Sequence, residues 1–196
     1  MIVRKFLIDD IKEASKISHL VWGDLYKCEN FDLQKFIYDF TIEYYYLNKD
    51  FSFALDEKGL CGLLFASLKT DKNTVLNDYK NKLQSLNNND KQKALNLIEY
   101  VENTGKEVKK VMSDNDFMLG LFISTQKGGG KMLLSQLYKT AITKGIKNIY
   151  LWTDTTCDFD YYQKNNFTLV KQFDCTVNNQ NINTLIFKKE IENIKE

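Results

Sequence analysis

The pattern of apolar and polar residues divides the chain into short apolar runs and amphipathic segments. Residues 117–123 are almost wholly apolar, which is typical of a strand buried on both faces of a sheet. Apolar residues then recur at helical spacing between residues 132 and 142, and Gly145 is a usual helix end. Residues 148–153 form a second apolar run. This order of strand, loop, helix and strand predicts a crossover that makes the two strands parallel.

Shorter versions of both patterns flank this unit. Hairpin turns are predicted at residues 56–59, which end in glycine, and at residues 177–181, which are rich in asparagine. The other predicted elements are a strand at 2–5, a helix capped by Asp9 or Asp10, a helix at 32–47, and strands at 51–55, 60–66, 168–173 and 182–188.

Residues 70–115 break the pattern of strands. They are polar and rich in lysine and asparagine, and they carry two apolar stripes at helical spacing on either side of residues 87–90. Asp90 is a plausible N-cap for the second stripe. We therefore expect two helices inserted between the third and fourth strands of a mixed, mostly antiparallel sheet that is flanked by helices, an α/β (α+β) architecture.

Composition narrows the functional classes. The 196 residues suit one domain, spanning 1–196, and a net charge of +1 gives no reason to expect nucleic-acid or membrane binding. No apolar run reaches membrane-spanning length, so the cytoplasm is the expected location. The single histidine, His19, has no partner set for a metal site, and the four scattered cysteines indicate neither zinc nor a disulfide framework.

The candidate chemistry lies in the loop before the central helix. Gly128-Gly129-Gly130 is flanked by Lys127 and Lys131 at the predicted helix N-terminus, where backbone N–H groups and the helix dipole favour phosphate. The alternative is a flexible turn with surface lysines. A Walker-type loop is disfavoured because Met132 stands where a serine or threonine should follow the lysine.

The end of the unit, Tyr162-Gln163-Lys164-Asn165-Asn166-Phe167, resembles the motif Y-E-K-x-G-F of the GNAT acetyltransferase superfamily. The glycine loop resembles that family's pyrophosphate loop, Q/R-x-x-G-x-G/A, although the segment between Ile123 and Gly128 is about three residues shorter than the common pattern. Asn166 replaces the motif's glycine, and asparagine is the next-best residue for positive φ.

The resemblance implies a fold, a co-substrate and a set of site residues. The two parallel strands should splay apart so that acetyl-CoA enters between them. The backbone of Leu121, Phe122 and Ile123 should bind pantetheine, and Tyr162 should act as the general acid. The remaining residues assigned to acetyl-CoA are Lys127, Gly128, Gly129, Gly130, Lys131 and Thr156.

The implied reaction is direct transfer of an acetyl group to an unidentified primary amine, on a small molecule or a peptide. No general base stands out: Asp116, Glu43 or a water chain are open, and Cys157 as an acyl-enzyme nucleophile lacks a nearby histidine. Aromatic residues, among them Trp22, Tyr26 and Tyr44–Tyr46, either cover the acceptor side of the cleft or form a core seam.

Two other functional classes stay open. One is a noncatalytic acyl-CoA-binding or interaction module that keeps the fold, which the shortened glycine loop favours. The other is a nucleotide-binding switch, which the missing Walker residue and the strands before the loop oppose. The sequence leaves open whether the protein is a monomer or a homodimer.

Overall fold

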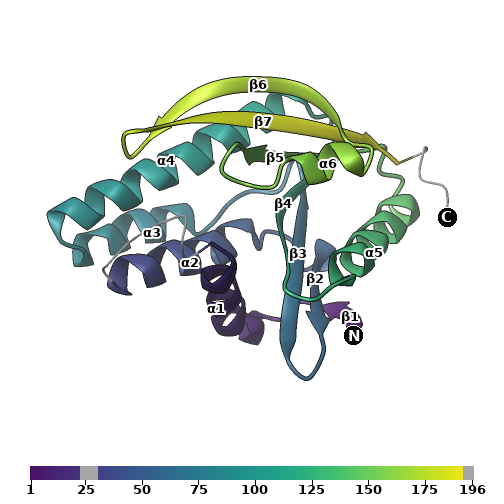
Figure 1. Cartoon of the computed structure of the whole chain (residues 1–196), viewed down its shortest axis with the longest axis horizontal. Coiled ribbons are helices and arrows are strands. Elements are labelled where there is room, and N and C mark those ends of the chain that lie inside the picture. Colours follow the sequence, from purple (N-terminus) through teal and green to yellow (C-terminus); the bar gives the residue numbers. More distant parts are fainter. Residues whose placement is uncertain (23–30, 192–196) are drawn as a thin grey trace.

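The computed structural model describes residues 1–22 and 31–191. Its centre is a mixed seven-stranded sheet of order β1-β2-β3-β4-β5-β7-β6, in which only β4 and β5 pair in parallel (Figure 1). This is the predicted sheet. The strands are β1 Ile2–Lys5, β2 Ser52–Asp56, β3 Leu60–Leu68, β4 Phe117–Ser124, β5 Asn148–Asp154, β6 Thr168–Val177 and β7 Gln180–Glu190.

Helices cover both faces of the sheet (Figure 1). One face packs against α1–α4 and the other against α5 and α6, so the core divides into two clusters separated by the sheet. The α-helices are α1 Ile11–Trp22, α2 Phe31–Tyr45, α3 Leu76–Lys82, α4 Asn88–Val111, α5 Gly129–Thr143 and α6 Asp160–Lys164. No helix in the described ranges is long and apolar enough to cross a membrane.

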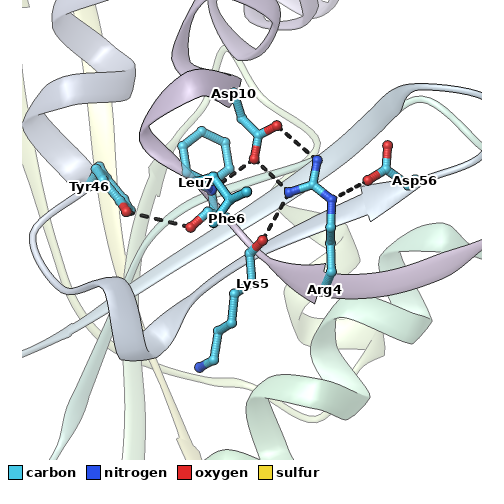
Figure 2. Close-up of polar contacts among 7 residues, drawn as sticks. All are labelled: Arg4, Lys5, Phe6, Leu7, Asp10, Tyr46 and Asp56. Carbon is cyan, nitrogen blue, oxygen red and sulfur yellow. Dashed lines mark hydrogen bonds and ion pairs between the residues drawn. The ribbon is translucent and has the colours of Figure 1, made fainter.

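Arg4 joins β1 to the 3-10 turn Ile8–Asp10 that leads into α1 (Figure 2). Its guanidinium donates to both carboxylate oxygens of Asp10, at 2.6 and 2.8 Å, and to Asp56 of β2. The Arg4 hydrogen bond lowers the pKa of Asp10, and burial partly opposes that effect. The prediction that Asp9 or Asp10 is the N-cap was wrong. Both lie in a 3-10 turn capped by Leu7, whose N–H donates to Asp10 from outside that turn.

The inserted pair is α3 and α4, and the prediction of two helices between the third and fourth strands is confirmed. The predicted cap was three residues late. Asn87 is the N-cap of α4, and its side-chain oxygen accepts the N–H of Asp90 at 3.0 Å. Asn87 has extended backbone angles, as an N-cap needs, whereas Asp90 is already in the helix.

The splay of β4 and β5 begins at a bulge. The two strands pair only from Phe117–Ile149 to Leu119–Leu151, although both continue for several residues. On the other side of β4 the register with β3 slips at Gly120, so that this residue has no direct partner. A bulge bends the strand that carries it, and the end of β4 therefore separates from β5.

The two asparagine predictions that concern backbone shape also hold. Asn166 has φ 62° between α6 and β6, where the family motif has glycine. Asn178 and Asn179, with φ 49° and 65°, form the tight turn between β6 and β7.

Candidate functional site

The opening between β4 and β5 leads into a cavity of about 1820 Å³. Its lining includes Leu121 and Trp152 from the core cluster on the α1–α4 side, and Phe122 and Tyr162 from the cluster on the α5 side. The cavity therefore connects the two faces of the sheet. Two ligands that approach from opposite faces can meet in it.

One end of the cavity lies at the N-terminus of α5. Gly128 is the N-cap of this helix, with φ 82°, and Gly130 and Lys131 in its first turn also line the cavity. The first N–H groups of a helix have no acceptor within the helix, and they favour an anion. Lys139 of α5 and Lys189 of β7 add two more positive charges to the lining.

Two residues assigned to acetyl-CoA are placed differently from the prediction. Gly129 is buried, and a Cβ there would lie 2.4 Å from Leu55 Cδ2 and 2.5 Å from Ser124 Oγ. Its N–H donates to the carbonyl of Gln126 at 3.0 Å, so this glycine packs the helix onto the sheet and does not line the cavity. Lys127 is exposed and also lies outside the lining. A helical turn points neighbouring residues in different directions, which the loop sequence does not reveal.

The end of β4 forms one wall. Leu121, Phe122 and Ile123 all line the cavity, beyond the last residue that pairs with β5. Their backbone groups on the β5 side lie where the ladder has ended, so they are available to a ligand's amides. The Phe122 ring reaches the start of α5, where its Cζ lies 3.1 Å from the position of a Cβ on Gly130.

Tyr162 lies on the opposite wall, in α6. Its ring packs against Phe167 and Phe187, with centroids 5.7 and 5.9 Å apart. Burial, with smaller effects of Cys157 and Tyr161, raises the pKa of its hydroxyl well above the ordinary value. The group is therefore protonated at neutral pH. Tyr161 also lines the cavity, and burial raises its pKa too.

The other acid–base and nucleophile candidates are less suited to the cavity. Asp116 accepts from the backbone of Ser113 and from Asn148, both at 2.7 Å. Glu43 contributes, after burial, to the raised pKa of Tyr79. Neither carboxylate lines the cavity. Cys157 does line it, but burial raises the pKa of its thiol, which opposes the thiolate that a nucleophile needs.

Asp154 is the acidic residue that the sequence interpretation missed. It is buried, 8% exposed, at the end of β5, and it lines the cavity next to Thr156. Its Oδ1 accepts the backbone N–H of Thr156 at 2.9 Å and the Thr156 hydroxyl. Its Oδ2 accepts from the Tyr100 hydroxyl at 3.2 Å, which is also 2.9 Å from Thr184 Oγ1. The available signal was its position directly after an apolar strand.

Only some of the aromatic residues singled out in the sequence line the cavity. Trp22 and Tyr45 line the cavity, whereas Tyr44 and Tyr46 do not, and Tyr26 lies outside the described residues. Other members of this wall come from the middle of α2, from the inserted α4 and from β5. They are Tyr38, Thr41, Leu97, Val101 and Trp152.

The described residues meet the requirements of neither a metal site nor a disulfide bond. Residues 1–22 and 31–191 hold no group of three or more histidine, cysteine or acidic side chains that could bind a metal ion. Cys61, Cys157 and Cys175 are free thiols. The fourth cysteine, Cys28, lies outside the described residues.

Comparison with known proteins identifies the fold. No protein-family model matches the sequence, and no curated protein matches it either. Among solved structures, an aminoglycoside 6'-N-acetyltransferase complexed with coenzyme A is 14% identical, with a TM-score of 0.56 and 100% of each chain covered. An N-acetyltransferase from Staphylococcus aureus Mu50 is 15% identical, with a TM-score of 0.54, covering 95% of this chain and all of that one.

A third similar structure is Ard1 from Thermoplasma volcanium, 13% identical with a TM-score of 0.56 and 96% of each chain covered. These structures share the mixed sheet flanked by helices that the GNAT acetyltransferases have. At such low identity the likeness establishes the fold. The chemistry has to be argued from the residues of the cavity.

Proposed function

We propose that this protein, which has the GNAT fold, transfers an acetyl group from acetyl-CoA to a primary amine. The observation that carries the proposal is the cavity between β4 and β5, which joins a helix N-terminus on one side of the sheet to an aromatic, acidic compartment on the other. One similar structure is complexed with coenzyme A, which supports this choice of co-substrate.

The cavity residues at the start of α5 and at the end of β4 suit acetyl-CoA. Gly128, Gly130 and Lys131 offer backbone N–H groups and positive charge to the pyrophosphate. The free edge of β4 at Leu121, Phe122 and Ile123 offers hydrogen bonds to the pantetheine amides. Thr156 lines the cavity beside Asp154, and we assign it to the thioester end. Lys127 and Gly129 are not in the proposed set.

The chemical step requires loss of protons from the acceptor amine and protonation of the leaving thiolate. An ammonium acceptor first loses one proton, because only the neutral amine is nucleophilic. Its nitrogen attacks the thioester carbonyl carbon; the C–N bond forms, and the C–S bond breaks with its electron pair leaving on sulfur. Tyr162 donates its hydroxyl proton to this thiolate. The second amine proton, lost as the amide forms, reprotonates Tyr162, so that the net products are amide, CoA thiol and one proton.

Acetyl-CoA binding is tested at Gly128, which lines the cavity with positive φ and has open space where a Cβ would lie. Gly128→Asp and Gly128→Asn have nearly the same shape, and both residues tolerate this backbone region. They differ in charge. Acetyl-CoA in large excess should raise the melting temperature of the wild type and of the Asn variant.

The Asp variant should bind acetyl-CoA at least about fivefold more weakly than the Asn variant, since its carboxylate repels the pyrophosphate at a site that favours anions. Equal affinity of the two variants would place the pyrophosphate elsewhere. No thermal shift with wild type at millimolar acetyl-CoA would refute the proposal. If acetyl-CoA binds but no primary amine causes the release of CoA, the result would favour the noncatalytic acyl-CoA-binding module.

A further inference from the structure

The half of the cavity opposite the glycine loop carries features of its own, which point to the chemistry of the acceptor. Its wall is aromatic and aliphatic, and it draws on four elements that are distant in sequence. The residues are Trp22 of α1, Tyr38 and Tyr45 of α2, Leu97 and Val101 of α4, and Trp152 of β5. Such a wall favours a flat apolar body.

The inserted helix α4 is what closes this wall. Leu97 and Val101 are 5% and 7% exposed and lie one turn apart, so they present one apolar face to the cavity. Between them, Tyr100 packs its ring edge-on against Trp152, with centroids 5.4 Å apart. The insertion therefore contributes directly to the site and is more than a surface addition.

Tyr100 also holds the Asp154 carboxylate in position through a hydrogen bond. Its hydroxyl has one hydrogen, so when it donates to Asp154 Oδ2 at 3.2 Å it must accept from the Thr184 hydroxyl at 2.9 Å. With the two bonds from Thr156 to Oδ1, the Asp154 carboxylate has three donors in the described part of the chain. A carboxylate has about four acceptor sites, so it can still accept a bond from a ligand in the cavity.

The number of carboxylates that line the cavity limits how many ammonium groups an acceptor can bring into it. The described lining holds two carboxylates, Asp154 and Asp158, and Asp158 is exposed. Each ammonium group that leaves water needs an anionic partner. A polyamine or an aminoglycoside carries several such groups, whereas one buried carboxylate within an apolar wall matches a single one. Trp152 Nε1 adds a buried donor with no hydrogen-bond partner among the described residues.

We propose that the acceptor is a monoamine with a flat, apolar body: Asp154 binds its ammonium group, the wall that α4 completes binds the body, and Tyr100 is a positioning residue for Asp154. This inference rests on the proposed acetyl transfer. It assigns the inserted helix a part in substrate selection.

The kinetic test compares 2-phenylethylamine, spermidine and kanamycin as acceptors at saturating acetyl-CoA. Phenylethylamine should have the highest kcat/KM, by about tenfold or more, because only its ring gains from the apolar wall. Asp154→Asn should raise the KM for phenylethylamine about 10- to 100-fold, the loss expected for a hydrogen bond to a charged group. The affinity for acetyl-CoA should change little, because Asn keeps a side-chain oxygen that can accept from Thr156.

Tyr100→Phe should raise the same KM about threefold or more, and should add nothing in the Asp154→Asn background, since it acts only through that carboxylate. Tyr46→Phe is the matched control, because Tyr46 lies outside the cavity, and its KM should match the wild type. Full additivity of Tyr100→Phe with Asp154→Asn would overturn the positioning role.

A binding test without acetyl-CoA separates this inference from the proposed reaction. Both tryptophans of the chain, Trp22 and Trp152, line the cavity, so ligand binding should change the intrinsic fluorescence. Phenylethylamine should bind the wild type at least about tenfold more tightly than 2-phenylethanol, its uncharged analogue. Asp154→Asn should remove that preference.

Equal binding of amine and alcohol by the wild type would overturn the inference even if no variant folds. A higher kcat/KM for spermidine or kanamycin would also overturn it, and would leave the proposed acetyl transfer intact. Absence of acetyl-CoA binding together with selective binding of phenylethylamine would refute the acetyl transfer alone.

Discussion

Burial extends the pH range over which the Tyr162 hydroxyl stays protonated. A phenol at the surface loses its proton near pH 10, and burial against Phe167 and Phe187 moves the pKa of Tyr162 higher still. The adjacent Cys157 thiol is affected in the same direction. The same apolar surroundings therefore keep the proton on Tyr162 up to high pH, and they oppose nucleophilic attack by Cys157.

Tyr162→Phe keeps the ring and removes the hydroxyl, so its packing should barely change. If Tyr162 protonates the leaving thiolate, kcat should fall by about one hundred-fold, the lower range for a positioned acid. Acetyl-CoA affinity should stay the same, because the hydroxyl acts on charge that develops late in the reaction. The raised pKa predicts no loss of wild-type kcat through Tyr162 up to about pH 10.

Tyr161→Phe is the control for this prediction, measured by steady-state kinetics in parallel. Tyr161 lines the same cavity, but neighbouring residues of a helix point about 100° apart. Its turnover should resemble that of the wild type. Loss of activity in Tyr161→Phe alone would transfer the acid role to Tyr161, and full activity in both variants would assign protonation to solvent.

At the scale of elements, the cavity depends on how β4 and α5 meet. The bulge at Gly120 turns the end of β4 away from β5, and the Tyr45 ring occupies the space beside it: a Cβ on Gly120 would lie 2.5 Å from Tyr45 Cδ1. Gly129 lets the first turn of α5 pack closely on Leu55 and Ser124. Two small residues thus set the separation of the strands and the position of the helix N-terminus.

Two of the helical glycines, Gly129 in α5 and Gly105 in α4, should respond oppositely to alanine. Gly129→Ala inserts a methyl group into a closed contact and should destabilise the fold by about 1–3 kcal/mol. A Cβ at Gly105, in the middle of α4, would lie 3.6 Å from the Tyr44 hydroxyl, an ordinary contact. Gly105→Ala should therefore stabilise by about 0.5–1 kcal/mol through helix propensity. Urea unfolding measures the stability of both variants. Equal destabilisation by Gly129→Ala and Gly105→Ala would contradict this account.

At the scale of the whole molecule, the insertion is part of the fold. Helix α4 lies along the β6–β7 hairpin and the end of β5 (Figure 1), and its buried face includes Ala94, Ile98 and Val108. Lys171 of β6 forms an ion pair with Glu107 of α4 at 2.7 Å. These contacts tie the inserted segment to β5 and to the edge strand β6 of the sheet.

Limited proteolysis with trypsin should accordingly leave residues 70–115 intact under native conditions. Several lysines between Lys72 and Lys110 are potential cleavage sites, but cleavage requires local unfolding. Rapid cutting at several of these lysines, with the remaining chain intact, would contradict the packed arrangement.

The elements, their order, the inserted helices and the parallel pair were predictable from the sequence, because apolar periodicity and turn residues are local signals. The sequence also placed the glycine loop at a helix start and positive φ at Asn166. The tertiary structure shows which loop residues line the cavity, and Gly129 and Lys127 lie outside that lining. The tertiary structure alone brought Tyr100 to Asp154, 54 positions apart in sequence. Such contacts depend on strand register, bulges and helix rotation, which are set by packing between segments distant in the chain.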